Sequence, residues 1–348
     1  MIGIDISDKS IKIAEVSGRG TSHLRTVCWS PLSPNILRRG VVQDVALAAE
    51  AIREAFQKCS PFPVEGNVVV ASIPETQSFV RVIDLPVMAD SEMNEAVQWA
   101  VRQHIPFDLD RVYLDWQPLP RLAIDPNRRS VLVGAVQKDV VDPLLASLDG
   151  AGLKVAALEL EAQAIVRSVL PRDSESVRGV LIVDLGATST NIVFFDEGVM
   201  RFTTSIQLGG DDLTQKLAAS LHVLPGEAAE KKVGLGADGQ QQDPNTVLAM
   251  REAVMDLIGR VDRVVREMSA QFGQNRPLQA ILLTGGSANL AGITNAFAEV
   301  FPNIPVQIGS PWTNLYADSQ NQNFPLSQAD ASHFVTALGL ALRQIEYT

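Results

Sequence analysis

The same pattern of residues occurs twice in this chain, first over Ile2–Ile13 and again over Val180–Val193. Each copy begins with an apolar strand that ends in an Asp followed by one more apolar residue. A turn of small or polar residues comes next, and a second apolar strand follows it. This order predicts two β-hairpins of the same design, each with an Asp near the end of its first strand.

The tips of both predicted hairpins suit an anionic ligand. Small residues let backbone N–H groups and hydroxyls approach the ligand closely, and successive N–H groups form an anion-binding nest. The two strand-end residues, Asp5 and Asp184, carry charge that can hold a metal ion or its bound water. Two such hairpins that face each other would clamp the phosphates of a nucleotide from both sides.

Composition excludes several classes of protein. A chain of 348 residues suggests two or more domains. No apolar run approaches the ~20 residues that a membrane-spanning helix needs, and the first residues do not resemble a secretion signal. The net charge of −11 has the wrong sign for a nucleic-acid-binding protein. We therefore expect a cytoplasmic protein that neither inserts into a membrane nor binds nucleic acid.

The cysteines and histidines give no sign of a metal site. Cys28 and Cys59 are the only cysteines and lack metal-ligand spacing, so a reducing cytosol fits them and a disulfide framework does not. The four histidines are scattered along the sequence. A nucleotide would therefore have to be held by local N–H groups and a metal ion on the Asp residues, against the negative field of the whole chain.

The rest of the sequence alternates between strand and helix patterns, which is typical of an α/β protein. Residues 79–150 differ in texture, with an alternating strand, a helix that begins at Asp90, two further strands and a helix. We expect this block to be a subdomain inserted into a larger fold. Near the end, the buried strand Leu278–Thr284 runs into Gly285 and Gly286, and a last helix is predicted over Ser332–Ile345.

Two Asp hairpins followed by a strand that ends in Gly-Gly resemble the actin/Hsp70 nucleotide-binding superfamily. Its FtsA-like branch carries an extra subdomain inside the first half, where this chain has residues 79–150. Further segments look like the PilM family of type IV pilus assembly proteins: Glu95–Trp99, Ile105–Phe107, Leu114–Trp116, Gly209–Thr214, Leu282–Ser287 and Ser310–Trp312. The similarity covers essentially the whole chain.

This resemblance implies an α/β fold of the actin/Hsp70, ribonuclease H-like type, in which two related halves carry an FtsA-type insertion. The first half is expected over 1–78 and 151–172, and the inserted subdomain over 79–150. The second half is expected over 173–348, with a C-terminal helix that returns to the first half.

The resemblance also implies roles for matching residues. Asp5 and Asp184 would hold Mg²⁺ and its waters, and Asp184 and Glu161 would take part in catalysis, with Glu161 orienting the attacking water. For Glu161 a plain helix-terminal carboxylate, favoured by the helix dipole, is an equal alternative. The residues expected to contact ATP or ADP are Ser7, Lys9, Ser10, Lys12, Gly186, Ala187, Thr188, Ser189, Thr190, Gly210, Lys231, Gly285, Gly286, Ser287 and Leu290. Lys12 could instead be a solvent-facing strand residue.

Two departures from the family pattern weigh against tight binding and fast hydrolysis. Ser7 and Asp8 stand where Gly is usual, and a second negative charge beside the phosphates costs on the order of 1–4 kcal/mol in partly wet surroundings. Glu230 stands where relatives have a Lys that clamps adenosine, so Lys231 or Lys232 must replace it. We therefore expect ATP binding with weak or no ATPase activity.

The function implied by the resemblance is a cytoplasmic, actin-like scaffold of pilus assembly that binds the N-terminal peptide of the inner-membrane protein PilN. Such proteins would form a ring, contact other pilus inner-membrane components and lie at the inner face of the membrane. Trp99, His104 and Phe107 either pack into the core or border the groove for that peptide. The alternatives are an FtsA-like division filament and the equivalent part of a type II secretion system. The sequence ends without an FtsA-like amphipathic helix, which favours attachment through a partner.

Overall fold

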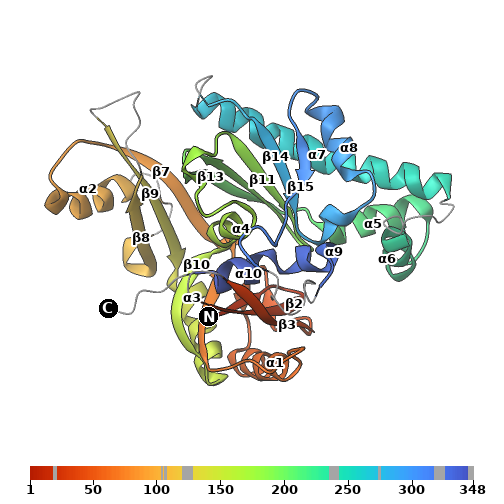
Figure 1. The fold of residues 1–348 in the computed structure, drawn as a ribbon, viewed down its shortest axis with the longest axis horizontal. Coiled ribbons are helices and arrows are strands. Elements are labelled where there is room, and N and C mark those ends of the chain that lie inside the picture. The colour runs from red at the N-terminus through yellow and green to blue at the C-terminus, as the bar shows by residue number, and fades with distance from the viewer. Residues whose placement is uncertain are drawn as a thin grey trace.

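Two five-stranded sheets form the centre of the structure, a computed structural model (Figure 1). The structure describes residues 1–18, 22–102, 105, 108–119, 128–234, 243–272, 276–316 and 326–343. In spatial order, the first sheet contains β10 (Lys154–Leu160), β6 (Val68–Ile73), β1 (Ile2–Ile6), β2 (Ser10–Ser17) and β3 (His23–Pro31). The second contains β13 (Val199–Ile206), β12 (Thr190–Asp196), β11 (Val180–Leu185), β14 (Ala280–Thr284) and β15 (Val306–Ile308).

The two sheets have the same topology. Strands β1, β2 and β3 form an antiparallel meander, and β6 and β10 add in parallel on the other side of β1. In the second sheet β11, β12 and β13 form the meander, and β14 and β15 add in parallel. The predicted hairpins are therefore confirmed as the first two strands of each sheet, and the fold is a duplicated α/β fold of the actin type.

Helices cover the outer face of each sheet. On the first sheet these are α1 (Val45–Gln57) and α3 (Lys138–Gly150), and on the second α5 (Gly210–Leu221), α7 (Pro244–Phe272) and α8 (Ile293–Val300). Helix α6 (Pro225–Gly234) packs beside α5. Helix α1 begins at Asp44, whose carboxylate accepts a hydrogen bond from the Leu47 N–H (3.0 Å), and its apolar face buries Ile52 and Ala55.

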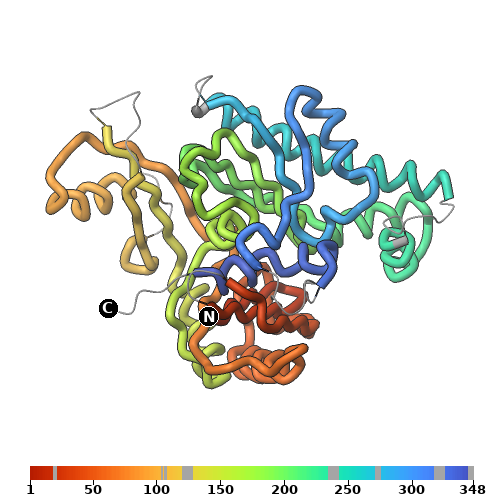
Figure 2. The backbone as a smooth tube through the Cα atoms, viewed as in Figure 1, coloured from red at the N-terminus to blue at the C-terminus, as the bar shows by residue number. Residues whose placement is uncertain are grey.

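Two helices lie between the sheets, α4 (Glu161–Val169) and α10 (Val335–Ala341). They approach so closely that a Cβ atom at Gly339 would lie 1.8 Å from the Ala164 carbonyl oxygen, so only glycine fits there. The C-terminal stretch packs beside the N-terminal strands, blue against red in Figure 2. The helix predicted over Ser332–Ile345 begins later than expected, as α10, because a 3₁₀ turn, η5 (Ser332–Phe334), occupies its first three residues; the short helix α9 (Gln328–Ala331) precedes that turn.

The segment within 79–150 forms a separate three-stranded sheet at the left of Figure 1. Its spatial order is β7 (Ser78–Pro86), β9 (Arg128–Gln137) and β8 (Val112–Pro118), all antiparallel. Helix α2 (Asp90–Arg102) covers one face through Met93, Val97 and Val101, and the other face packs Leu132 against the cluster around α4. Leu144 and Leu148 of α3 pack with the first half, so packing places this last helix of the predicted insertion with the first sheet.

Short elements complete the described chain: a two-stranded hairpin, β4 (Leu37–Arg38) and β5 (Val41–Val42), and the 3₁₀ turns η1 (Glu75–Gln77), η2 (Leu109–Arg111), η3 (Ser174–Ser176) and η4 (Gly286–Asn289). In the ranges that the structure describes, no helix has the length and apolar character needed to cross a membrane.

The expectation that the two cysteines form no disulfide was wrong. A disulfide joins Cys28 and Cys59, whose Cα atoms are 4.5 Å apart. Backbone hydrogen bonds between Val27 and Ser60 (3.1 and 3.2 Å) bring β3 beside the segment that follows α1. The pairing depends on this long-range contact, which cysteine spacing in the sequence does not reveal.

Candidate functional site

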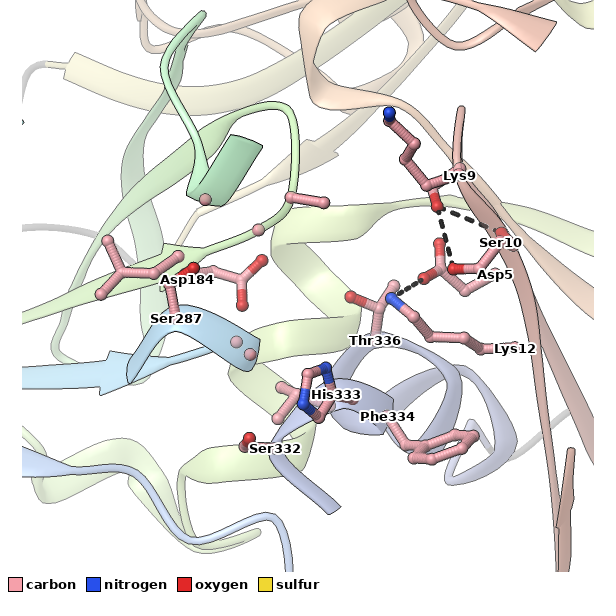
Figure 3. A pocket seen from close by; sticks show the side chains of 18 of the residues that line it. Asp5, Lys9, Ser10, Lys12, Asp184, Ser287, Ser332, His333, Phe334 and Thr336 are labelled. Atoms are coloured by element: carbon pink, nitrogen blue, oxygen red, sulfur yellow. Dashed lines mark hydrogen bonds and ion pairs between the residues drawn. The ribbon is translucent and has the colours of Figure 1, made fainter. Parts of the chain in front are cut away.

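A cavity of about 1070 Å³ lies between the two halves (Figure 3). Both predicted hairpins contribute to its walls, together with η4, η5 and the first residues of α4, α5 and α10. The predicted site residues that line it are Asp5, Ser7, Lys9, Ser10, Lys12, Glu161, Asp184, Gly186, Ala187, Thr188, Ser189, Gly210, Gly285, Gly286, Ser287 and Leu290. Thr190 and Lys231 are absent from the lining. The fold therefore gathers residues from widely separated segments into one cleft.

The first hairpin presents a buried carboxylate and a lysine side by side. Asp5 near the end of β1 faces Lys12 across the β1–β2 pair, and the lysine Nζ lies 3.5 Å from the Asp5 Oδ2. The Ser72 hydroxyl, from β6, donates to the Asp5 Oδ1 (2.9 Å). At the tip, the Ser7 N–H donates to the Ser10 carbonyl (3.0 Å). Lys12 thus points into the cavity, and the solvent-facing alternative for it is wrong.

The second hairpin repeats this arrangement with a different partner. Asp184 pairs in register with Asn191 on β12 and with Thr284 on β14, and the Thr284 hydroxyl donates to the Asp184 Oδ1 (2.9 Å). Burial raises the pKa of Asp184, and the charge of Asp5 adds to the increase. The N-terminus of α5 docks on the tip, where the Gly210 N–H donates to the Gly186 carbonyl (2.9 Å). Thr190 points away from the cavity, since its hydroxyl donates to the Leu208 carbonyl (2.8 Å).

Glu161 is the first residue of α4 and joins the two aspartates in the cavity. The Asn191 side-chain amide donates to its Oε2 (2.9 Å). Burial, followed by the charges of Asp5, Glu75 and Asp184, raises the pKa of Glu161 to about 8. At neutral pH this side chain therefore holds a proton, which makes it a poor base until a cation lowers its pKa.

Asp8, expected to place a negative charge beside the phosphates, lines a smaller pocket next to the main cavity, together with Ser7, Thr188 and Ser189. Its two carboxylate oxygens accept hydrogen bonds from the N–H groups of Arg39 (2.8 Å) and Gly40 (2.7 Å). The cavity lining includes Ser7 and Lys9 but not Asp8. The carboxylate thus fixes the hairpin tip against the β4–β5 turn.

Of the two lysines expected as replacements for the adenosine-clamping lysine, only one lines the cavity. Lys232 lines the cavity, and its amino group donates to the Gly210 carbonyl (2.7 Å), whereas Lys231 pairs with Glu227 (3.5 Å). Burial lowers the pKa of Lys232. Lys9, at the tip of the first hairpin, forms an ion pair with Asp211 at the start of α5 (2.9 Å). This pair bridges the two halves across the cleft.

The carboxylates suit a metal ion that keeps most of its waters better than a metal ion bound entirely by protein side chains. Among the described residues, no group of three or more His, Cys, Asp or Glu side chains is close enough to bind one metal ion. Asp5 and Asp184 nevertheless face one cavity with Glu161, and Lys12 lies beside Asp5. Mg²⁺ usually keeps several waters and takes one or two protein carboxylates, so this pair fits it.

Some cavity residues could not be found from motifs. His333 comes from η5, at the start of the predicted last helix and outside any predicted ligand-binding motif, and Trp29 lies on β3 and is 54% exposed. Asn191 could have been found, because it directly follows the predicted tip and faces Asp184 across the hairpin.

Of the three residues expected either to pack into the core or to border the peptide groove, the structure describes one. Trp99 on α2 is 67% exposed, so the alternative that it packs into the core is wrong. His104 and Phe107 lie outside the described residues.

Comparison with known proteins places this chain in a family. The family model described as Type IV pilus assembly protein PilM matches residues 3–345. Among solved structures, the chain is similar to a PilM–PilN type IV pilus biogenesis complex, with a TM-score of 0.82 and 26% sequence identity over 98% of this chain and 97% of that one. FtsA, the cell division protein of Neisseria meningitidis serogroup B, is 25% identical over 350 residues, 87% of this chain and 80% of FtsA.

A more distant neighbour shares the fold alone. MreB5 of Spiroplasma citri bound to AMPPNP has a TM-score of 0.52 and 13% identity, over 97% of this chain and 93% of that one. The FtsA match is to a related family, whereas the PilM model spans nearly the whole sequence. This chain therefore belongs to the PilM family of type IV pilus assembly proteins.

Proposed function

We propose that this chain binds ATP or ADP with Mg²⁺ in the cleft and acts as a cytoplasmic scaffold that carries PilN. The observation that supports nucleotide binding best is the pair Asp5 and Asp184, which occupy equivalent positions in the two sheets and face one cavity. The nucleotide-bound state named for MreB5 is consistent with this use of the fold.

The residues around Asp5 and Asp184 would contact different parts of the nucleotide. Lys12 and the N–H groups of both hairpin tips would contact phosphates, and the Gly285–Gly286 turn would approach the nucleoside. Bound Mg²⁺ would supply positive charge that neutralises the phosphates and the carboxylates together. Lys232, which lines the cavity, would take the place of the adenosine-clamping lysine, whereas Lys231 lies outside the lining. Hydrolysis would require Glu161 to lose its proton, so the proposal covers binding and not turnover.

The proposed partner is the N-terminal peptide of PilN, because a similar chain is found in a PilM–PilN complex. Contact with PilN would hold the protein at the inner face of the membrane. Trp99 offers an exposed aromatic side chain on α2, the kind of residue that anchors a peptide interface. Self-association into a ring and contacts with other pilus components belong to the same proposal.

A chain of contacts connects the cleft with the inserted sheet. Asp8 of the first hairpin holds the backbone of Arg39 and Gly40, and the Gln77 side chain donates to the Arg39 carbonyl (2.8 Å). Gln77 immediately precedes β7, the first strand of the inserted sheet. A nucleotide that fixes the hairpin tip would therefore restrict the start of β7 and, through it, the surface offered to PilN.

Titration of a synthetic PilN N-terminal peptide from the same organism, with and without Mg·ADP, tests this function. We expect saturable binding that changes in affinity when Mg·ADP is present, and no binding of a scrambled peptide. Trp99→Ala should lower the affinity for the peptide. Phe62→Ala, which removes another exposed aromatic ring (55% exposed), should leave that affinity unchanged. Absence of peptide binding to the wild-type protein would contradict the scaffold proposal.

A further inference from the structure

The C-terminal segment brings His333 into the cleft, although no predicted motif includes it. His333 lies in η5, between α9 and α10, and its side chain is exposed to the cavity. Both of its neighbours are fixed. The Ser332 hydroxyl accepts a hydrogen bond from the side chain of Asn289 on η4 (2.8 Å), and Phe334 is buried against the first half. The backbone therefore holds the imidazole at one place on the cavity wall.

The imidazole of His333 crosses the boundary between the halves. A Cβ atom at Gly286 would lie 2.3 Å from the Cε1 and 2.6 Å from the Nδ1 of the ring. Any side chain at position 286 would thus displace the imidazole, and glycine is needed for this close approach. Since His333 belongs to a segment that packs on the first half and Gly286 to the second, the contact joins the two across the cleft.

The ring nitrogens are available to a ligand. Within the part of the chain that the structure describes, no hydrogen bond joins them to another residue. The walls of the cavity partly desolvate the ring and lower the pKa of His333, and the positive charge of Lys12 lowers it further. At neutral pH the ring is therefore uncharged, with one nitrogen that donates a hydrogen bond and one that accepts.

The surroundings of the ring indicate which group it would meet. Figure 3 shows His333 between Asp184 and Ser287 on one side and Lys12 and Asp5 on the other. A ligand group that touches both the imidazole and the Lys12 ammonium is favoured if it carries negative charge, because charge-assisted hydrogen bonds are the stronger ones. A nucleotide offers such a group in its phosphates and lacks one in its base and ribose.

We propose that His333 donates a hydrogen bond to a phosphate group of the bound nucleotide. The contact with Gly286 keeps the ring in position for this bond, so the phosphate and both halves of the cleft are held together at one point. This inference rests on the proposed function, because it requires a nucleotide in the cavity.

Calorimetric titration of Mg·ADP and of adenosine into the wild type and two His333 variants, with one further variant as a control, tests the inference. His333→Ala should lower the affinity for ADP by roughly tenfold or more, as expected for a lost hydrogen bond to a charged group. His333→Gln keeps an N–H donor and should stay within about threefold of the wild type. Adenosine has no phosphate, so we expect all three proteins to bind it equally. His23→Ala removes an imidazole outside the cavity lining and should change neither affinity.

Ring ¹⁵N NMR gives a second, independent readout. The His333 signal, assigned by its absence from the His333→Gln spectrum, should shift on addition of ADP and not of adenosine. Equal ADP affinity in the wild type and His333→Ala would overturn the inference and leave the proposed function standing. If His333→Ala lost affinity for adenosine and for ADP equally, the role of His333 would be structural, and this result would also overturn the inference. A wild-type protein that binds no ADP would refute the proposed function itself.

Discussion

Replacing Glu161 with Gln is expected to stabilise the protein at neutral pH, by an amount that grows with pH. In the folded protein burial and neighbouring carboxylates raise the pKa of Glu161 from 4.5 to about 8. The folded protein therefore holds a proton that the unfolded chain releases between these two values. Raising the pH through this window favours unfolding, because the unfolded state then binds fewer protons than the folded one.

The size of the effect follows from the two pKa values. One pH unit within the window changes the free energy of unfolding by about 1.4 kcal/mol. pH 7 is two and a half units above the unfolded pKa of 4.5. At this pH the free energy of unfolding of the wild type is therefore up to about 3 kcal/mol lower than that of a protein with a side chain at position 161 that stays neutral in both states. Gln is neutral in both states, and its carbonyl oxygen can still accept the hydrogen bond from Asn191. We therefore expect Glu161→Gln to raise the free energy of unfolding by this amount at pH 7 and by almost nothing near pH 4.5.

Urea unfolding followed by circular dichroism at several pH values between 4.5 and 8.5 measures this difference. The gap between variant and wild type should widen with pH and level off above about 8. Glu54→Gln, which changes an exposed side chain on α1, controls for the loss of one carboxylate. A gap that does not change with pH, or a variant less stable than the wild type at pH 7, would refute the assigned burial and charge environment.

Three further predictions concern other contacts. Asp211→Asn frees Lys9 and removes a negative charge from the cleft, so we expect Mg·ADP affinity by calorimetry to rise about two- to fivefold, in keeping with an exposed ion pair; an unchanged or weaker affinity would contradict this. Gly339→Ala places a methyl group against the α4 backbone and should cost about 3 kcal/mol or more in urea unfolding. Gly259→Ala in α7, where nothing lies within 4 Å, should instead be neutral or stabilising by up to about 1 kcal/mol; similar losses in both would rule out the packing argument. Asp8→Ala leaves two backbone N–H groups without their acceptor and should lower the free energy of unfolding by about 2 kcal/mol; stability equal to the wild type would show that these bonds contribute nothing.

The sequence predicts those parts of the site that depend on local pattern. The alternation of apolar residues around Asp5 and Asp184 determines both hairpins, and in each the Asp faces the second strand as the pattern requires. The apolar run that ends at Thr284 similarly predicts a buried strand leading into the Gly285 turn. These features need only neighbours within a few residues, so periodicity and turn composition are sufficient.

The features that sequence reasoning missed depend on contacts between distant segments. Asp8 appears as an unfavourable charge in the motif, yet the backbone of the β4–β5 turn satisfies it. Glu75 follows a strand and gives no sign of burial, but it is buried in the structure. It accepts a hydrogen bond from Thr203 on β13 (2.7 Å), and burial raises the pKa of Glu75 to about 7. His333 likewise becomes part of the cleft only because α10 returns to the first sheet.

Calorimetric titration of Mg·ADP into the wild type and Asp184→Asn tests the central claim most directly. Asn keeps the oxygen that accepts the Thr284 hydrogen bond and removes only the charge proposed to hold the hydrated Mg²⁺. We predict one site per chain in the wild type, with affinity that falls when Mg²⁺ is omitted. In Asp184→Asn the affinity for Mg·ADP should be at least about tenfold weaker, the loss of a charge-assisted interaction. A wild type that gives no binding heat, or a variant that binds as tightly with the same Mg²⁺ dependence, would contradict the assignment of this cleft as a nucleotide site.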